Sequence, residues 1–221
     1  MSMRKALCAT TAFMALVVCA TGVQAKALRN SLEIQGYGQW VAVDANNSAS
    51  TLNPANGLPW VVYENGWGGG FSIGYNIIDW FEVEFDYSHV KNDFTAPGYR
   101  GSFIACTVLN CENKTNTFTF FGTFNIPAGE FVSPYARLGV GGFVSDNPAW
   151  HVTGASVVAG AGVRVFPIPD NGLNLRVGTD LAGFFPTTTD GFLTLGNFVE
   201  ESTFNVRVIF GLGYVFSFGS N

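Results

Sequence analysis

A row of carboxylates is the first feature of this sequence that could do chemistry. Glu82, Glu84 and Asp86 occupy alternate positions, so their side chains would share one face of a β-strand. Paired carboxylates in different environments can divide the roles of general acid and general base. Alternating acids that face basic residues are more often structural ion pairs, and we expect no catalytic residue among them.

Arginines supply the opposite charge in other segments with the same alternation. Every cation in these polar rows is an arginine, whereas strands that face water would also carry lysine. The planar guanidinium group binds a carboxylate through two hydrogen bonds and suits a buried ion pair. We therefore predict an enclosed ion network, with solvated strands as the alternative; its members are Glu33, Glu82, Glu84, Asp86, Arg137, Arg164, Arg176, Asp180 and Arg207.

The cysteines and histidines predict no metal site. Cys106 and Cys111 are separated by four residues, and a disulfide is the natural state for such a pair in an exported protein. His89 and His151 are distant in sequence, and no further cysteine remains to complete a tetrahedral zinc site. We expect no metal and no cofactor.

Alternation with a period of two residues defines the elements that hold these groups. From Phe204 to Phe218 every second residue is apolar, and the residues between them include Asn205, Arg207, Gly211 and Gly213. This period indicates a β-strand and not a helix. Eight segments show it, at residues 32–44, 67–78, 80–90, 115–126, 131–144, 154–166, 172–185 and 202–218.

The connections between these segments alternate in length. Short ones, rich in Pro, Asp, Asn and Gly, lie near residue 79, at 127–130 and at 167–171, whereas the connections at 45–66, 91–114, 145–153 and 186–201 are mostly long and polar. An antiparallel meander would place all short turns and both termini at one end. We predict an all-β, eight-stranded antiparallel up-and-down transmembrane β-barrel, because its strands suffice to cross a bilayer. A barrel of this size has a lumen that side chains fill.

Composition agrees with a lipid-facing surface and an exported chain. Only 12% of the residues are charged, against about 25% in ordinary soluble domains. Residues 1–25 have the basic start, apolar run and small-residue end of a cleaved signal peptide, which leaves 26–221 as the barrel domain. That domain carries a formal charge of about −7, since all 16 acidic residues but only nine of the 11 basic ones follow the signal. Nucleic acid is therefore excluded as an expected partner.

Aromatic residues suggest two belts at the membrane interfaces. Such girdles flank the apolar band of membrane barrels. The expected belt near the short turns contains Tyr75, Trp80, Tyr135, Phe166 and Phe216, and the belt near the long loops contains Trp40, Trp67 and Trp150.

Three segments resemble a known family of barrels. Residues 74–84 (GYNIIDWFEVE), 133–141 (SPYARLGVG) and 160–165 (GAGVRV) are similar to recurrent strand and turn pieces of the outer membrane protein A-type, opacity-protein-like β-barrel family. The resemblance covers essentially the whole mature chain. It implies a monomer in the outer membrane of a Gram-negative-type bacterium, with both termini in the periplasm, in contact with membrane lipids and lipopolysaccharide.

The same resemblance leaves several functions open, because the family includes structural barrels, adhesins, immune-evasion proteins and narrow channels. We expect a structural or surface-recognition protein that meets host molecules or phage through loops 45–66, 91–114 and 186–201. A low-conductance channel is the alternative. A third hypothesis is lipid A deacylation, since residues 89–92 (HVKN) are similar to the His-x-Ser-Asn stretch of the deacylase barrels; Lys91, however, stands in the place of the nucleophile.

Overall fold

A computed structural model describes residues 28–43, 62–95, 111–126, 128–146, 150–168, 171–191 and 203–218. Eight long strands account for nearly all of them, and a two-residue strand, β2 (Val62–Tyr63), adds to the edge of β4. The long strands are β1 (Ser31–Val43), β3 (Gly66–Ile78), β4 (Phe81–Thr95), β5 (Cys111–Asn125), β6 (Val132–Asp146), β7 (Trp150–Val165), β8 (Leu173–Gly191) and β9 (Thr203–Ser217).

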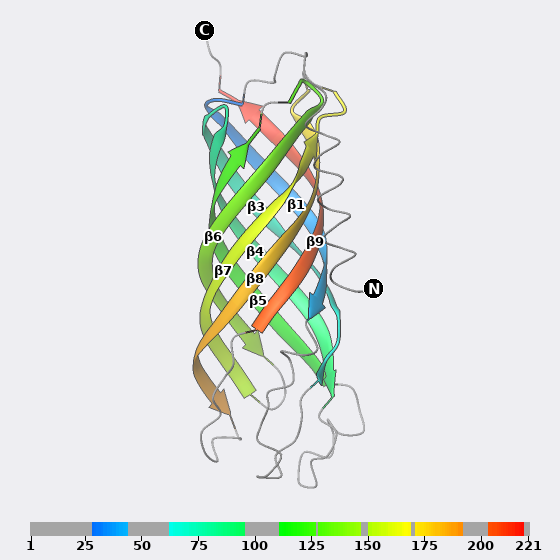
Figure 1. Cartoon of the computed structure of the whole chain (residues 1–221), viewed down its shortest axis with the longest axis vertical. Coiled ribbons are helices and arrows are strands. Elements are labelled where there is room, and N and C mark those ends of the chain that lie inside the picture. The colour runs from blue at the N-terminus through cyan, green and yellow to red at the C-terminus, as the bar shows by residue number, and fades with distance from the viewer. Residues whose placement is uncertain are drawn as a thin grey trace.

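The eight long strands close into one antiparallel barrel. Each strand pairs with its neighbours in the chain, and β1 pairs with β9 from Ser31 opposite Ser217 to Val43 opposite Asn205. The strands are tilted against the barrel axis (Figure 1), as closure of a sheet requires. The predicted fold class, an eight-stranded antiparallel up-and-down barrel, is confirmed.

Short turns gather at one end of the barrel, together with the start of β1 and the end of β9 (Figure 1). Asp79, in the turn between β3 and β4, accepts hydrogen bonds from the backbone N–H groups of Leu28 and Arg29 at 2.9 and 2.8 Å. These bonds fix the segment before β1 against this turn. We call this the turn end and the opposite one the loop end. Most of the loop-end connections lie outside the described residues. The same holds for residues 1–25, which the sequence predicts to be a signal peptide, for Cys106 and for the side chain of Cys111.

Several strands run further toward the loop end than the sequence predicted. Strand β4 continues to Thr95, β5 begins at Cys111 and β8 continues to Gly191. The third loop-end connection, predicted at 145–153, is therefore much shorter, because β6 ends at Asp146 and Asp146 already pairs with His151. The polar residues at these strand ends resemble a loop in composition, although their backbone groups remain paired in the sheet.

The barrel is polar inside and apolar outside. Every long strand exposes large apolar side chains on its outer face, such as Phe120 on β5 (61% exposed) and Val140 on β6 (62%). Most of the buried residues are instead polar or charged. Among the described residues, no helix is long and apolar enough to cross a membrane.

The aromatic residues follow the predicted belts only in part. Tyr75, Trp80 and Phe216 are exposed near the turn end, and Trp67 is exposed near the loop end. Trp40 is half-buried opposite Trp67, and the side chain of Trp150 lies outside the described set.

Two members predicted for the turn-end belt point inward. Tyr135 is 2% exposed, and Phe166 is 1% exposed in a cluster with Leu28 and Val215. The prediction was wrong for these two because it used their height along the barrel and ignored the alternation of the strand: Tyr135 has the same phase as Arg137.

Candidate functional site

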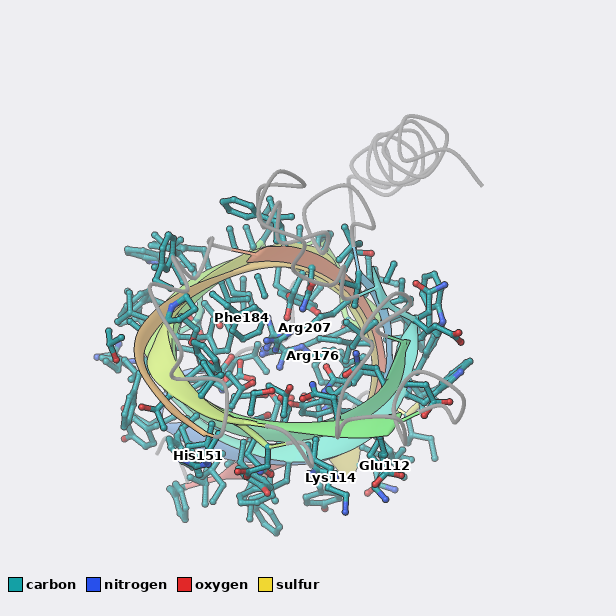
Figure 2. The ribbon with its side chains drawn as sticks, turned by 90° about the horizontal axis from the view of Figure 1, so that it is seen from below. Glu112, Lys114, His151, Arg176, Phe184 and Arg207 are labelled. Carbon is teal, nitrogen blue, oxygen red and sulfur yellow. The ribbon has the colours of Figure 1, made fainter. Side chains whose placement is uncertain are left out.

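All nine charged residues of the predicted network lie inside the barrel, and none is more than 4% exposed. They come from six strands: β1, β4, β6, β7, β8 and β9. Figure 2 looks along the axis from the loop end and shows Arg176 and Arg207 within the ring of strands, whereas Glu112, Lys114 and His151 lie outside it. Period-two alternation sends these polar side chains inward on each strand.

Glu84 lies at the centre of the ion pairs. Nη1 of Arg137 donates to Oε1 of Glu84 at 3.1 Å, and Arg176 donates to both carboxylate oxygens at 3.0 to 3.1 Å. Arg137 also binds Asp180 through a two-pronged contact, with Nε to Oδ1 at 3.0 Å and Nη2 to Oδ2 at 2.6 Å. Because β4, β6 and β8 each contribute, these bonds connect opposite walls of the lumen.

A second group of ion pairs lies nearer the turn end. Arg164 donates from Nη2 to Oε2 of Glu82 at 2.5 Å and from Nη1 to Oδ1 of Asn125 at 2.9 Å. Its Nη1 also lies 3.3 Å from Oε2 of Glu33. Burial of each charge costs several kcal/mol, so such contacts compensate for lost hydration more than they add stability.

Arg207 differs from the other three arginines. Among the described residues it makes no ion pair or hydrogen bond, and its contact is with the ring of Phe184, whose centroid lies 5.5 Å from Cζ. Asp180 is its cross-strand neighbour on β8, but both Asp180 oxygens are bound to Arg137. A cation–π contact supplies roughly 0.5–2 kcal/mol, which is less than the several kcal/mol that burial of a guanidinium costs.

Asp86 is the one acid of the network that makes no ion pair among the described residues. Its Oδ1 accepts a hydrogen bond from the Tyr37 hydroxyl at 2.8 Å, and its Oδ2 has no partner among the described residues. The structure thus brings seven of the nine predicted residues into ion pairs and leaves Asp86 and Arg207 outside them.

Neutral lumen residues that sequence reasoning missed complete the packing. The Tyr135 ring lies between Arg176, at 4.3 Å from its centroid, and Arg164, at 5.5 Å. Gln35 accepts a hydrogen bond from Nη1 of Arg176 at 2.9 Å. Sequence reasoning could have found both residues. Tyr135 lies two positions before Arg137 and Gln35 two positions after Glu33, so both side chains point into the lumen.

Glycines make room for these long side chains. A Cβ atom on Gly74 would collide with Glu82, and a Cβ on Gly160 would collide with Asp180. Gly162 and Gly178 lie against the Tyr135 hydroxyl in the same way. The glycines of the alternating segments are therefore part of the lumen packing and do not indicate flexible linkers.

Apolar clusters flank the charged layer on both sides. Leu28, Phe166 and Val215 pack together at the turn end. Toward the loop end, a larger cluster contains Phe121, Phe143, Val158, Ala182 and Phe184. With the ion network between them, the described lumen is a packed interior and offers no wide aqueous path.

His89 lies on the outer surface, as its predicted phase requires. Its Nδ1 is 2.9 Å from Oδ1 of Asn116, which also accepts a hydrogen bond from the Tyr87 hydroxyl at 2.9 Å. Lys91 forms an ion pair with Glu112 at 3.2 Å. Within the described part of the chain, no serine or threonine hydroxyl is hydrogen-bonded to His89, so the geometry offers no activated nucleophile.

Comparison with known proteins supports this architecture. No protein-family model and no curated protein matches the sequence. Neisserial surface protein A superposes with a TM-score of 0.55 and 12% identity, covering 84% of this chain and 99% of that one. OprG from Pseudomonas aeruginosa superposes with a TM-score of 0.53 and 14% identity, covering 89% of this chain and 100% of that one.

A third match is the outer membrane protein AlkL, determined by solid-state NMR in lipid bilayers, with a TM-score of 0.54 and 18% identity. It covers 91% of this chain and 95% of that one. The chain therefore has the fold of the small eight-stranded outer membrane β-barrels, and the resemblance inferred from its sequence is confirmed at the level of fold.

Proposed function

We propose that this chain is a bacterial outer membrane protein whose filled barrel is a rigid support for surface loops with a structural or recognition role. The observation that carries the proposal is the inverted polarity of the barrel: large apolar side chains outside and a network of buried ion pairs inside. A surface of this kind is stabilised by acyl chains, and a lumen of this kind has no passage for solutes.

The placement in the membrane is part of the same proposal. Residues 1–25 serve as an export signal, the turn end with both termini faces the periplasm, and the loop end faces the exterior. In known barrels of this class the short turns are periplasmic and the long loops extracellular. Cys106 and Cys111 form a disulfide that restrains the second loop, as expected after export.

The first test of this placement is cell fractionation with surface proteolysis. The protein should appear in the outer membrane fraction, migrate faster on gels before boiling than after, and be cut by external protease only at the loop end. Cleavage in intact cells within the turns at 126–131 or 166–172 would contradict the orientation.

A narrow channel is the second candidate, and unsatisfied polar groups in the lumen favour it. Gln39, Ser88, Thr119 and Ser156 are buried with side-chain atoms that lack partners among the described residues. Water bound to these groups could form part of a conducting path if the Arg137–Glu84 contact opened.

Planar-bilayer recording separates the two candidates. The closed barrel predicts negligible current for the wild type and for Arg137→Glu, provided that heat-modifiable migration shows the variant to be folded. A steady wild-type conductance that changes in ion selectivity with Arg137→Glu would favour the channel and contradict the filled lumen.

We also propose that the protein is not an enzyme. The contact of His89 with the amide oxygen of Asn116, and the lysine at position 91 in place of a nucleophile, support this view. Lipid A from cells with the wild type and from cells without the protein should give identical mass spectra. Loss of an acyl chain that depends on His89 would contradict it.

A further inference from the structure

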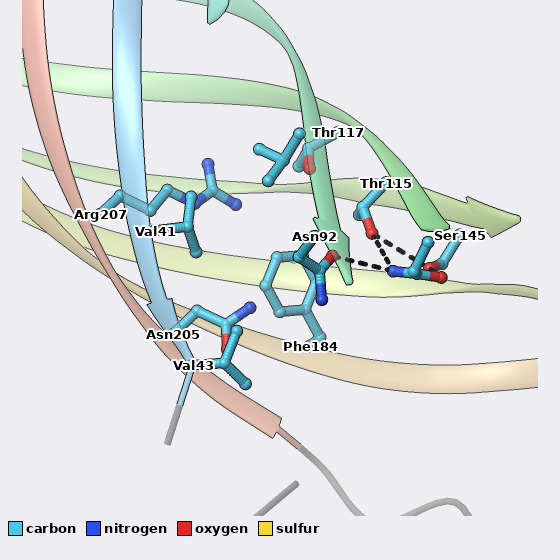
Figure 3. A pocket seen from close by; sticks show the side chains of 11 residues that line it. Val41, Val43, Asn92, Thr115, Thr117, Ser145, Phe184, Asn205 and Arg207 are labelled. Carbon is cyan, nitrogen blue, oxygen red and sulfur yellow. Dashed lines mark hydrogen bonds between the residues drawn. The ribbon is translucent and has the colours of Figure 1, made fainter. Parts of the chain in front are cut away.

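A small cavity lies in the lumen at the loop end. It has a volume of about 90 Å³ and is formed where β1, β4, β5, β6, β8 and β9 approach that end. Figure 3 shows Arg207, Asn205, Asn92 and Thr117 around it, with Phe184 as part of its wall. The space is large enough for a few water molecules or one small oxyanion and too small for a nucleotide or a sugar chain.

The cavity has four apolar lining residues, Val41, Val43, Val90 and Phe184, and its other lining residues are polar side chains and one cation. Oδ1 of Asn92 already accepts a bond from Asn113 at 3.2 Å, which leaves its Nδ2 group to donate into the cavity. Asn205 and Thr117 add an amide and a hydroxyl. Among the described residues, no carboxylate lines this space.

Arg207 is the cation, and it is 3% exposed with no acidic contact in the described part of the chain. The three other buried arginines each have a carboxylate within 3.3 Å. Asp180, its cross-strand neighbour, is hydrogen-bonded to Arg137, and the guanidinium of Arg207 lines the cavity without a counter-ion in direct contact among the described residues.

We infer that this cavity is a binding site for a small oxyanion, a carboxylate or a phosphate group, held by Arg207 with Asn92, Asn205 and Thr117 as further donors. Guanidinium groups bind planar carboxylates and phosphates through paired hydrogen bonds. Phe184 belongs both to the wall of this cavity and to the apolar cluster on the loop-end side of the charged layer. This inference rests on the proposed function in one respect: the proposed orientation decides on which side of the membrane the loop end lies.

Asp86 is the group that opposes anion binding. It is the one lumen acid without an ion pair in the described structure, and it lies on the inner face of β4 four residues before Val90, which lines the cavity. Removal of its charge should therefore strengthen binding. Asp86→Asn keeps an oxygen that can accept the Tyr37 hydroxyl, so this variant changes charge with little change in packing.

The experiment is a titration of the purified full-length protein in detergent micelles with sodium phosphate, and separately with sodium acetate, against sodium chloride at equal ionic strength. The Nε–Hε NMR signal of Arg207 reports on the site directly, and its shift should saturate with phosphate or acetate but not with chloride. A response to both anions identifies a general oxyanion site, and a response to only one identifies the preferred group.

The variants make the test specific. Arg207→Gln should weaken binding about tenfold or more, because a hydrogen-bonded charge is lost. Asp86→Asn should tighten it roughly threefold, since a nearby opposing charge is removed. Lys114→Gln, which removes a cation from the outer surface, is the matched control and should leave affinity unchanged.

Absence of saturable binding to either anion in the folded wild type would overturn the inference, as would equal affinity in a folded Arg207→Gln protein. If Arg207→Gln does not fold, the wild-type titration and the direction of the Asp86→Asn effect still decide the question. The titration needs neither a membrane nor a closed lumen, so its result is independent of the test of the proposed function.

Discussion

Glu84 is the residue on which most of the lumen contacts depend. It receives hydrogen bonds from Arg137, Arg176 and the Thr123 hydroxyl. Glu84→Gln would leave two buried guanidinium groups with less compensating charge. We expect it to lower the free energy of unfolding by about 3–5 kcal/mol, measured by urea titration in lipid vesicles.

The matched control for this substitution is Glu112→Gln on the outer surface. Glu112 also contacts two cations, Lys91 at 3.2 Å and Lys114 at 3.1 Å, but its side chain is 45% exposed. Water screens these pairs, so the control should unfold at nearly the wild-type urea concentration. Equal effects of the two substitutions would contradict an enclosed network.

Gly162 tests the role of glycine in lumen packing. A Cβ atom there would collide with the backbone oxygen of Val177 and with the Tyr135 hydroxyl, so Gly162→Ala should destabilise the barrel by about 1–3 kcal/mol. Gly36 has no atom within 4 Å of such a Cβ, and Gly36→Ala should have little effect. Thermal unfolding in micelles would measure both, and an equally stable Gly162→Ala protein would argue against close packing here.

The ion network shows how far single residues can be predicted from sequence. Alternation alone predicts that Arg137 and Glu84 face inward, because both lie in polar rows of their strands. It does not predict that Arg137 binds both Glu84 and Asp180, since these contacts join residues 53 and 43 positions apart across the lumen. The sequence also does not predict that Arg207 lacks an ion pair among the described residues, because this depends on which acids pair with the other three arginines.

At the scale of the strand, β9 carries the clearest separation of apolar and polar faces. Val208 lies on its outer face near the middle of the strand, and Arg207 beside it points inward. Val208→Arg should cost about 2–4 kcal/mol in a bilayer, because a charge near the midplane is placed in hydrocarbon.

Phe216→Arg, on the outer face near the turn end of the same strand, is the control. It should cost about 0–1 kcal/mol, since arginine is tolerated near the membrane interface. Urea unfolding in vesicles compares the two variants. If both cost the same small amount, the middle of β9 does not lie in hydrocarbon.

The strands themselves were largely predictable, and their loop-end limits were not. The period of two residues located all eight long strands within a few residues at the turn end, where Pro, Asp and Gly end each run. At the loop end, strands such as β8 continue through threonine-rich sequence to Gly191. Polar composition predicts a loop there, but cross-strand pairing with β7 keeps the chain extended.

At the scale of the whole molecule, closure and polarity have one common cause. A closed sheet pairs every backbone donor and acceptor of its strands, which a lipid environment requires. The alternation that turns apolar residues outward necessarily turns the intervening residues inward, and in this chain those are acids, arginines and glycines. The filled lumen and the apolar surface are therefore two results of the same pattern.

The most direct test of this account is a spin-label accessibility scan of β9 in lipid vesicles, with one label at a time along residues 204–216. At outward positions such as Val206, Phe210 and Leu212, the label should collide often with dissolved oxygen and rarely with a water-soluble nickel chelate. At the inward positions Ile209 and Val215, it should be shielded from both reagents. High accessibility to the nickel chelate at Phe210 and Leu212 would contradict the claim that this face contacts acyl chains.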